Sequence, residues 1–376
     1  MTAPQEARLS CSVIGCAIAL AESRTELVRL AETPGAACSI VQHPDWLAFE
    51  LAWRGPTTML YLVLASNGLG QVIGYAPFLA EAVHNVRLSL GSRRVLLYRG
   101  KVLRMLGDGV VALPADRELA EQLIAGALQR DGDIRVVRIQ ESDLPNSLAR
   151  AMGQGQRPFA TVSMNLVEQV ARSIAPQASS AAYLAQLDGK RRNDLTRRLR
   201  NVYKKLGGQT VLRIFNEPDQ VVEYTALMNR VYARSWHAEV LPIDWEMPER
   251  RALFRRLAED RHWIGHLLMR GERPVAYVHG YILGARYVLD DTGYDEEFAS
   301  LGIGSALVFE TVLDLLDRYP GVTIDFGYGD NQYKRVLADR QRECGSLYLA
   351  RGMWPRLGLS VVSLVRWGYR QAKRWR

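Results

Sequence analysis

The chain has 376 residues, of which 48% are hydrophobic and 23% charged, so its composition excludes disordered and fibrous proteins and its length allows two domains of ordinary size. The formal net charge of +8 is concentrated in two segments. Residues 188–206 carry eight Lys/Arg against two Asp, and after Glu343 seven Lys/Arg remain with no acidic residue. Two basic surfaces are therefore expected on an otherwise ordinary soluble protein.

The first half of the chain predicts a mixed α+β domain of about 150 residues. Its first apolar run, 11–21, is about half as long as a bilayer span and follows no basic segment, so we expect a buried strand. Asn67-Gly68 is the typical signal of a tight hairpin turn. The other expected elements are hairpin strands over 58–66 and 71–79, a second hairpin around 90–99, helices over 43–54 and 114–130, the latter with Asp116 as N-cap, and a strand over 134–139.

A change of composition marks the expected domain boundary. Residues 153–182 are richer in Gly, Pro, Gln, Ser and Ala than the segments on either side, as connections between domains commonly are. We therefore predict an N-terminal domain over 1–160, a connection over 161–182 and a C-terminal domain over 183–376.

The second half begins with a basic helix over 183–206. Leu195, Leu199, Val202 and Leu206 follow the helical period and form one apolar stripe, while Lys and Arg occupy the other faces. Gly207-Gly208 ends this helix. The elements expected next are a strand over 210–215, helices over 220–236 and 248–260, strands over 274–283 and 285–291, a glycine-containing loop, a helix over 305–319 and a strand over 322–327.

The glycine-containing loop, Gly302-Ile303-Gly304-Ser305, stands at the start of the helix expected over 305–319. Unpaired backbone N–H groups and the helix dipole favour an anion at such a position, and glycine lets a pyrophosphate approach the backbone. A G-x-G sequence is common, so taken alone it predicts only an ordinary helix start.

Four segments taken together resemble the GNAT acyltransferase superfamily and, within it, the CelD-like (cellulose-biosynthesis-associated) acetyltransferases, which are close to the FemAB-like tandem GNAT proteins. The segments are the basic helix, "YARSWHAE" (232–239), the strand pair with the glycine loop (274–307) and "IDFGYGDNQYKR" (324–335). The resemblance covers about residues 183–335, and the first domain is similar, more loosely, to the degenerate N-terminal half of these proteins. It implies an α+β fold of two tandem GNAT-like domains, each a mixed, mainly antiparallel sheet flanked by helices.

The resemblance implies an acyl-CoA-dependent N-acyltransferase that uses acetyl-CoA as co-substrate and no metal. The family's R/Q-x-x-G-x-G/A loop, which holds the pyrophosphate of the cofactor, corresponds to residues 299–304. Ala299 stands where the family usually has Gln or Arg, and Ser300-Leu301-Gly302 replaces the usual Ser-Pro-Gly. The expected cofactor-binding residues are Leu301, Gly302, Ile303, Gly304 and Ser305.

The strand over 274–283 supplies the expected general base. Alternation places Tyr277, His279 and Tyr281 on one strand face, and the ordinary pKa of histidine suits His279 to accept a proton from an amine. A buried histidine held for structural reasons is the alternative. Asp325, on the next parallel strand, is expected to orient a donor or to act as the base itself, with a structural role as its alternative.

The leaving thiolate and the acceptor need further residues. Tyr328 is expected to give the thiolate a proton, with Tyr333 as a second tyrosine for that role and simple packing as the alternative. The acceptor is expected to be the amine of a sugar, a small amino compound or a cell-envelope or polysaccharide precursor. According to the resemblance, the wall of the acceptor cleft is formed by Arg234, Ser235, Trp236 and His237. For Trp236, a place in the core is the alternative. Tyr281, Tyr333 and Lys334 are expected to bind substrate, Lys334 through a phosphate or carboxylate.

The cysteines and histidines give no metal signature. Four scattered cysteines without a CxxC pair favour a reducing cytoplasm over disulfides or zinc, and none has the surroundings of a nucleophile. His262 and His266 are four residues apart, but the "WIG" between them predicts a strand, which excludes a helical metal pair.

The two basic segments suggest partners. The helix face over 190–205 would bind a polyanion such as tRNA, or the phosphates of CoA or of a nucleotide-sugar, or is simply solvated. Residues 356–376 resemble an interfacial amphipathic helix that lies on anionic lipid at the inner face of the membrane, or else they dock on their own domain. Two rivals to the CoA-dependent enzyme remain: a FemAB-like aminoacyl-tRNA-dependent transferase, and a non-catalytic tandem-GNAT scaffold in a polysaccharide-synthesis complex.

Overall fold

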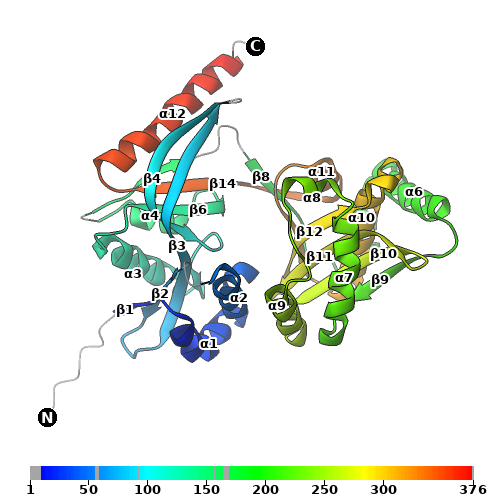
Figure 1. Cartoon of the computed structure of the whole chain (residues 1–376), viewed down its shortest axis with the longest axis horizontal. Helices are drawn as coiled ribbons and strands as arrows, with labels where there is room; N and C mark the ends of the chain where they lie inside the picture. Colours follow the sequence, from blue (N-terminus) through cyan, green and yellow to red (C-terminus); the bar gives the residue numbers. More distant parts are fainter. Residues whose placement is uncertain (1–9, 56–58, 91–92, 156, 164–168, 375–376) are drawn as a thin grey trace. The chain divides into compact units, whose positions relative to one another are not determined.

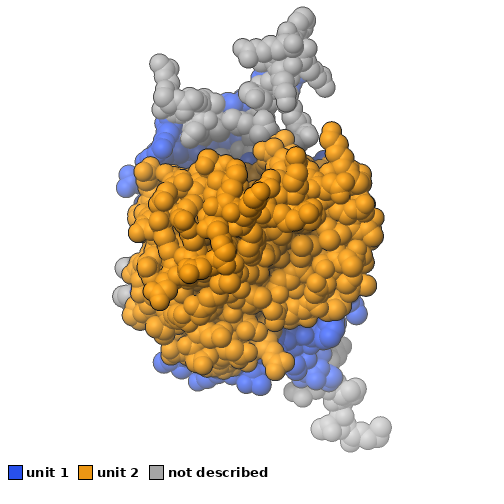
Figure 2. Space-filling model, turned by 90° about the vertical axis from the view of Figure 1, so that its right-hand side faces the viewer, with its two compact units in different colours: residues 1–170, 343–376 blue, residues 171–342 orange. Residues whose placement is uncertain are grey.

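The computed structural model describes residues 10–55, 59–90, 93–155, 157–163 and 169–374 (Figure 1). These residues form two compact units, which Figure 2 shows in different colours. Unit 1 comprises residues 1–170 and 343–376, and unit 2 comprises residues 171–342. No helix of the described part of the chain has the length and apolarity that a bilayer crossing requires.

Unit 1 is built on a mixed sheet with strand order β1-β2-β3-β4-β6-β14, in which β4 and β6 are parallel and the other neighbours are antiparallel. The short strands β5 and β7 pair with β3 and β14. Its elements are β1 (Ser10–Ile14), α1 (Ala17–Glu32), η1 (Ile40–Gln42), α2 (Pro44–Arg54), β2 (Met59–Ser66), β3 (Val72–Leu90), β4 (Arg93–Met105), β5 (Val111–Ala112), α3 (Arg117–Arg130), β6 (Val136–Asp143), α4 (Ser147–Met152), β7 (Ala160–Ser163), β14 (Arg340–Ala350) and α12 (Met353–Arg374).

Unit 2 holds the strand order β8-β13-β12-β11-β10-β9, in which β12 and β13 are parallel and the other neighbours are antiparallel. Its elements are β8 (Gln169–Ile174), α5 (Ser180–Gln186), α6 (Gly189–Leu206), β9 (Thr210–Phe215), η3 (Pro218–Gln220), α7 (Val221–Tyr232), α8 (Trp236–Val240), α9 (Pro248–Glu259), β10 (Trp263–Arg270), β11 (Arg273–Leu283), β12 (Arg286–Tyr294), η4 (Glu296–Leu301), α10 (Ile303–Arg318), β13 (Thr323–Tyr328) and α11 (Gln332–Leu337).

The two units repeat one arrangement of elements. In each, an antiparallel strand pair is followed by a helix and then by a strand parallel to the second member of the pair: β3, β4, α3 and β6 in unit 1, and β11, β12, α10 and β13 in unit 2. Both sheets are therefore mixed and mainly antiparallel, with helices around them. The predicted fold class is confirmed.

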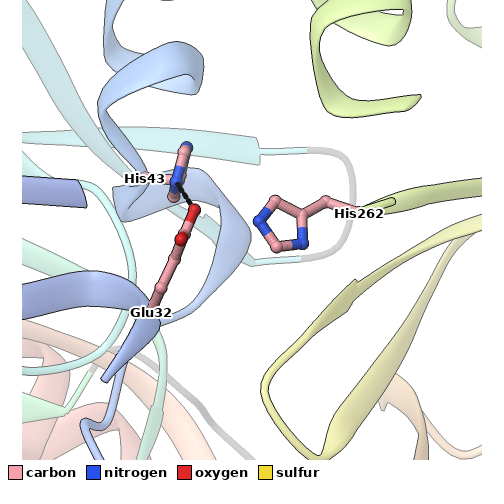
Figure 3. A group of neighbouring side chains, drawn as sticks. All are labelled: Glu32, His43 and His262. Atoms are coloured by element: carbon pink, nitrogen blue, oxygen red, sulfur yellow. Dashed lines mark hydrogen bonds and ion pairs between the residues drawn. The ribbon is translucent and has the colours of Figure 1, made fainter. Parts of the chain in front are cut away.

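The start of the chain differs from the prediction. Residues 11–21 form the end of β1 and the first turns of α1 rather than one buried strand. Leu20, Leu27 and Leu30 are buried at helical spacing, and this period extends beyond the short apolar run. The histidine before α2 ties the two helices together, because His43 Nε2 lies 3.3 Å from Glu32 Oε1 at the end of α1 (Figure 3).

The compact units also differ from the predicted domain boundaries. Strands β7 and β8 occupy described parts of the expected connection, and its residues 164–168 lie outside the described residues. Residues 343–376 were expected in the C-terminal domain but belong to unit 1, because β14 pairs with β6 and β7, and α12 packs against β4 and β7. Local composition carries no information about such pairing between distant segments.

Candidate active site

The two faces of strand β11 differ, as its alternation predicts. Ala276, Val278 and Ile282 join the hydrophobic core that this strand shares with α6 and α10. His279 and Tyr281 face the opposite layer, where α7 and α9 bury them among aromatic rings. The face with the predicted base is therefore an aromatic layer that contains ionisable groups.

A β-bulge in β12 lies directly beside His279. The ladder pairs His279 with Asp291 and Gly280 with Leu289, so Asp290 is an extra residue with no partner opposite it on β11. Consecutive residues of a regular strand point to opposite faces. The bulge removes this alternation at one step and allows two consecutive carboxylates to share a face.

Both carboxylates contact the layer that contains the histidine. Nε2 of His279 lies 3.1 Å from Oδ2 of Asp290, and the same oxygen accepts a hydrogen bond from the Tyr281 hydroxyl at 3.2 Å. Oδ2 of Asp291 accepts a hydrogen bond from the Tyr277 hydroxyl at 3.0 Å. The tyrosines and the histidine of β11 thus contact two consecutive acidic residues of β12.

The environment shifts the pKa values of the Asp290 and Asp291 carboxyl groups in opposite directions. Desolvation disfavours the charge of Asp290, but hydrogen bonds from His279 and Tyr281 outweigh it and lower the pKa of this carboxyl. For Asp291, desolvation is stronger than the attraction of His279 and His237, and the neighbouring charge of Asp290 adds to it, so its pKa is raised. A pair of carboxyl groups with pKa values driven apart is typical of acid/base sites.

His279 itself is fully enclosed. Its side chain has no exposed surface, and its ring centroid lies 5.1 Å from that of Trp245 and 5.4 Å from that of Phe254. Its Nδ1 is buried without a hydrogen-bond partner among the described residues. The Asp290 side chain, in contrast, keeps 36% of its surface exposed. Asp290 is therefore accessible to solvent, whereas the imidazole lies behind it.

Helix α8 brings an exposed aromatic residue to the same region. Nδ1 of His237 lies 3.8 Å from Oδ1 of Asp291, and the ring centroids of His237 and Trp236 are 3.8 Å apart. Trp236 is 49% exposed, so it is not the core residue that the alternative interpretation required. Trp236 lies at the surface and contacts His237, which in turn lies next to Asp291, the carboxyl group whose pKa is raised.

The glycine loop begins helix α10. Gly302 has left-handed backbone angles (φ 70°, ψ 31°), which glycine adopts without strain, and its carbonyl accepts both the Ala306 N–H (3.2 Å) and the Ser305 hydroxyl (3.1 Å). Gly302 and Ser305 are exposed, whereas the side chain of Ile303 is buried and that of Leu301 packs partly on the core. These two apolar residues can offer a ligand only their backbone.

Gly304 is required by packing inside the unit. A Cβ at this position would lie 2.6 Å from Cδ1 of Tyr294, while one at Gly302 would meet nothing closer than the Ser305 hydroxyl at 3.8 Å. At the start of α10, a ligand therefore has room beside Gly302 but not beside Gly304. The acidic Glu296 and Glu297 precede it, and no basic side chain replaces the one missing at Ala299 within the loop.

Asp325 does not join this site. Its side chain is 3% exposed and accepts hydrogen bonds from Arg286, from Arg342 (3.1 Å) and from the Gly327 N–H (2.6 Å). Strand β12 lies between β11 and β13, so two strand spacings of about 4.8 Å separate the strand of Asp325 from that of His279. The arginine contacts of Asp325 fit the structural alternative for this residue, and its predicted roles as base or as orienting group stay predictions.

The segment after β13 is a tight turn followed by the short helix α11. Gly327 and Gly329 have positive φ angles of 66° and 99°, as the bend requires. Lys334 is buried and its Nζ donates to the Tyr328 carbonyl at 2.7 Å. The ammonium group therefore helps to close the turn, and the expected contact of Lys334 with a substrate phosphate or carboxylate stays a prediction.

The tyrosines of this segment have different surroundings. Tyr333 packs edge-on against Phe326, with ring centroids 6.1 Å apart, and burial raises its pKa to about 12. Its hydroxyl is therefore protonated at neutral pH. Tyr328 is half-buried at the end of β13. The parallel ladder of β12 and β13 ends at Val288 and Asp325, although both strands continue, so Tyr328 lies beyond the point where the strands separate.

Sequence reasoning missed the two acids that hold the site together. Asp290 and Asp291 are visible as "LDD" near the end of an expected strand, but alternation would have turned one of them away. Trp245 was also missed, since it lies on an irregular segment, whereas His237 was expected in the wall of the acceptor cleft. Two consecutive acids on a strand next to a histidine face were the available signal. His266, in contrast, lies in strand β10 as predicted.

Comparisons with known proteins support the fold. Residues 189–335 match the family described as "Acetyltransferase (GNAT) domain". No curated protein sequence matches the chain. Solved structures that resemble it include FemX (11% identity, TM-score 0.59, 91% of this chain and 98% of FemX) and L-PGS from Bacillus licheniformis (12% identity, TM-score 0.52, 91% and 96%).

A conserved protein of unknown function from Bacteroides thetaiotaomicron is similar to the same extent (14% identity, TM-score 0.53, 91% of this chain and 100% of that one). At these identities the likeness concerns the fold, and it extends over both units. Residues 189–335 match a GNAT domain, and the fold of the chain as a whole resembles that of FemX and L-PGS.

Proposed function

We propose that this chain, as a tandem GNAT-type transferase, moves an acetyl group from acetyl-CoA to the amine of a sugar, a small amino compound or a cell-envelope or polysaccharide precursor. The observation that carries the proposal is the bulge of β12, which turns Asp290 and Asp291 toward the face of His279 on the strand that leads to the α10 glycine loop. Acyl transfer to an amine needs a base and an anion site for the donor, and this strand connects the two.

Asp291 is the proton acceptor in this proposal. An amine must lose a proton to attack a thioester, and a carboxyl group with a raised pKa is a stronger base than an ordinary one. Asp290 stays ionised and is held in place by His279 and Tyr281, so it can attract the ammonium form of the acceptor. His279 then positions Asp290 and does not touch the amine. Exposed Trp236 would border the acceptor, and Tyr281 would contribute only through Asp290.

The donor is assigned to the start of α10. The first N–H groups of a helix have no intrahelical acceptor, and the dipole of this 16-residue helix favours the pyrophosphate of acetyl-CoA. Gly302 leaves the approach open. Where β12 and β13 separate, a thioester could pass from this loop toward Asp291, and Tyr328 or protonated Tyr333 would supply the thiolate proton.

An aminoacyl-tRNA donor is the second proposal. Helix α6 supports it, since it carries eight Lys/Arg and exposes Arg197 and Arg198, although both pair with Asp194 (2.6 and 2.8 Å). The likeness to FemX is consistent with it at the level of fold. In either case we place the reaction in the cytoplasm, next to a membrane that supplies the acceptor.

Calorimetric titration of the full chain with acetyl-CoA, CoA and deacylated tRNA separates the donors, and thiol release from acetyl-CoA across amino sugars, amino acids and polyamines identifies the acceptor. Binding of acetyl-CoA that Gly302→Glu abolishes supports the first proposal. Binding of tRNA without acetyl-CoA binding replaces it with the second. Binding of neither leaves the non-catalytic scaffold as the remaining explanation and overturns both transfer proposals.

A further inference from the structure

A pocket lined with arginines lies in unit 1, outside the proposed active site. It has a volume of about 430 Å³, and its wall contains Arg135, Arg157, Arg351 and Arg356 together with Gly352. No acidic side chain lines it. Arg135 directly precedes β6, Arg157 lies before β7, Arg351 lies in the link from β14 to α12, and Arg356 lies in the first turn of α12. The fold thus brings the four arginines together from three parts of the sequence.

Backbone carbonyls hold two of these arginines in place. The guanidinium group of Arg351 donates to the carbonyls of Gln129 (2.5 Å), Ile134 (2.6 Å) and Asp131, and that of Arg356 donates to the carbonyls of Ala350 (3.3 Å) and Pro158. Carbonyl acceptors fix a guanidinium group without neutralising it. None of the four arginines forms an ion pair with a carboxylate in the described part of the chain.

The positive charges are close enough to oppose one another. Desolvation, and then the charges of Arg135 and Arg157, lower the pKa of Arg351, and the weaker opposing effect of the Asp131 carboxylate does not cancel this shift. Arg135 and Arg157 are exposed, so their side chains can turn toward a ligand. Gly352 has a φ of 87°, and a Cβ there would lie 3.2 Å from a guanidinium nitrogen of Arg135. The glycine therefore keeps room for this side chain.

Helix α12 starts at the pocket. Its 22 residues follow Gly352 directly, so the unpaired N–H groups and the positive dipole end of the helix add to the arginine charge. Fixed guanidinium groups beside a helix start are suited to a phosphate group. The pocket thus has the chemistry of a phosphate site.

The same helix has a second apolar face. Leu359 and Val362 are buried against the sheet of unit 1, and the carbonyl of Leu97 on β4 approaches Gly358 so closely that no Cβ would fit. The opposite face carries large apolar side chains that are 40–76% exposed. This exposed stripe consists of Met353, Trp354, Leu357, Val361, Leu364 and Trp367. It begins beside the pocket, since Met353 follows Gly352 and Leu357 follows Arg356.

We propose that the arginine pocket binds the phosphate of an anionic lipid headgroup while the exposed stripe of α12 enters the interfacial layer of the membrane. The charge of α12 favours a lipid surface over a second copy of the chain as the partner that covers the exposed stripe. Residues 353–374 contain five Lys/Arg and no acid, so two such helices would repel each other, whereas an anionic bilayer attracts both the charge and the stripe. This inference holds independently of the donor and acceptor of the transfer reaction.

Sedimentation of the full chain with vesicles tests the proposal. Vesicles of phosphatidylcholine alone are compared with vesicles of equal parts phosphatidylcholine and phosphatidylglycerol. The pocket variant Arg135→Gln/Arg157→Gln removes two charges that make no structural bonds, and we expect about 30-fold weaker binding to anionic vesicles. The matched control Lys190→Gln/Arg192→Gln removes two exposed charges on α6 and should change binding less than about 3-fold.

The stripe variant Leu357→Gln/Leu364→Gln should lose sedimentation with both vesicle types. Inorganic phosphate should compete with anionic vesicles for the wild type and not for the pocket variant. Equal binding of wild type and pocket variant overturns the headgroup site. Phosphate binding without vesicle binding replaces the lipid with a soluble phosphate ligand, and a concentration-dependent dimer that the stripe variant abolishes replaces it with a second copy of the chain.

Discussion

Replacement of Asp291 by Asn tests the proposed base directly. Asn keeps the shape of the side chain and can still accept the hydrogen bond from Tyr277, which is 3.0 Å long in the wild type, but it cannot take a proton from an amine. General-base catalysis contributes about 100- to 10,000-fold in typical enzymes. We therefore expect kcat/KM of Asp291→Asn to fall by such a factor, which corresponds to about 3–5 kcal/mol in the activation barrier.

The same substitution should stabilise the fold at neutral pH. Desolvation raises the pKa of Asp291 in the folded state, so its neutral form favours folding below the unfolded pKa of about 3.9, and this contribution is lost as the pH rises through the folded value. At neutral pH the ionised carboxylate thus opposes folding. Asn removes this cost, and the gain in Tm should disappear when the pH falls to about 3.9 or below.

The assay combines thiol release as a function of pH with thermal unfolding of the same samples. Asp290→Asn is the matched control one residue away. Its pKa is lowered, so its charge stabilises the fold above the unfolded pKa, and its removal should reduce Tm at neutral pH. The reasoning is refuted if Asp291→Asn keeps wild-type kcat/KM per folded molecule, or if both variants shift Tm in the same direction at neutral pH.

Four further substitutions separate structural from catalytic roles, with chemical denaturation and turnover per folded molecule as the measurements. Gly304→Ala should lower the free energy of unfolding by about 1–3 kcal/mol, because the new Cβ clashes with Tyr294. Gly302→Ala should lower it by about 1–2 kcal/mol, because alanine is strained in the left-handed backbone conformation of this position. A variant as stable as the wild type would contradict the corresponding value. Asp325→Asn should lower the free energy of unfolding by an amount near the lower end of about 3–5 kcal/mol, because its arginine partners are partly exposed. Its turnover should be unchanged. Cys344→Ala should also keep turnover, and its loss in folded protein would oppose a mechanism without a thiol.

The elements of unit 2 were predictable because their signals are local. Alternation along β11 separates Val278 from His279, and the structure places them on opposite faces of the sheet. The helical stripe of α6 buries Leu195, Val202 and Leu206 as expected. Periodicity also predicted the order of strand pair, glycine loop, helix and strand. Each of these features depends on residues a few positions apart.

The features that define the site depend on contacts between distant residues. The bulge at Asp290 leaves no mark in the sequence around it. It nevertheless breaks the alternation of side chains between the two faces of β12, so that Asp290 and Asp291 share a face. Asp325 looked available from the sequence, but Arg286 and Arg342 reach it from separate strands. The arginine pocket, assembled from three segments, was invisible for the same reason. Tertiary pairing, and not propensity, decides the roles of such residues.

The repeated arrangement of elements raises the question of which unit binds the donor. Helix α3 of unit 1 occupies the same topological place as α10 of unit 2, between the antiparallel pair and the parallel strand. Its start carries Asp116 and Glu118 against one basic residue, Arg117, whereas the first turn of α10 has no acidic residue and begins at an exposed glycine. A carboxylate at a helix start already interacts with the dipole and repels a phosphate.

If the chain binds acetyl-CoA as proposed, the charge at the helix start, and not the fold, favours unit 2 as the site of the donor. One acetyl-CoA per chain is the expected stoichiometry in calorimetric titration, and Gly302→Glu, which gives α10 a carboxylate at the position nearest its open approach, should reduce it to none. Two equivalent sites per chain would mean that α3 binds the donor in spite of its acids, and the assignment of the α10 start by charge would then be wrong.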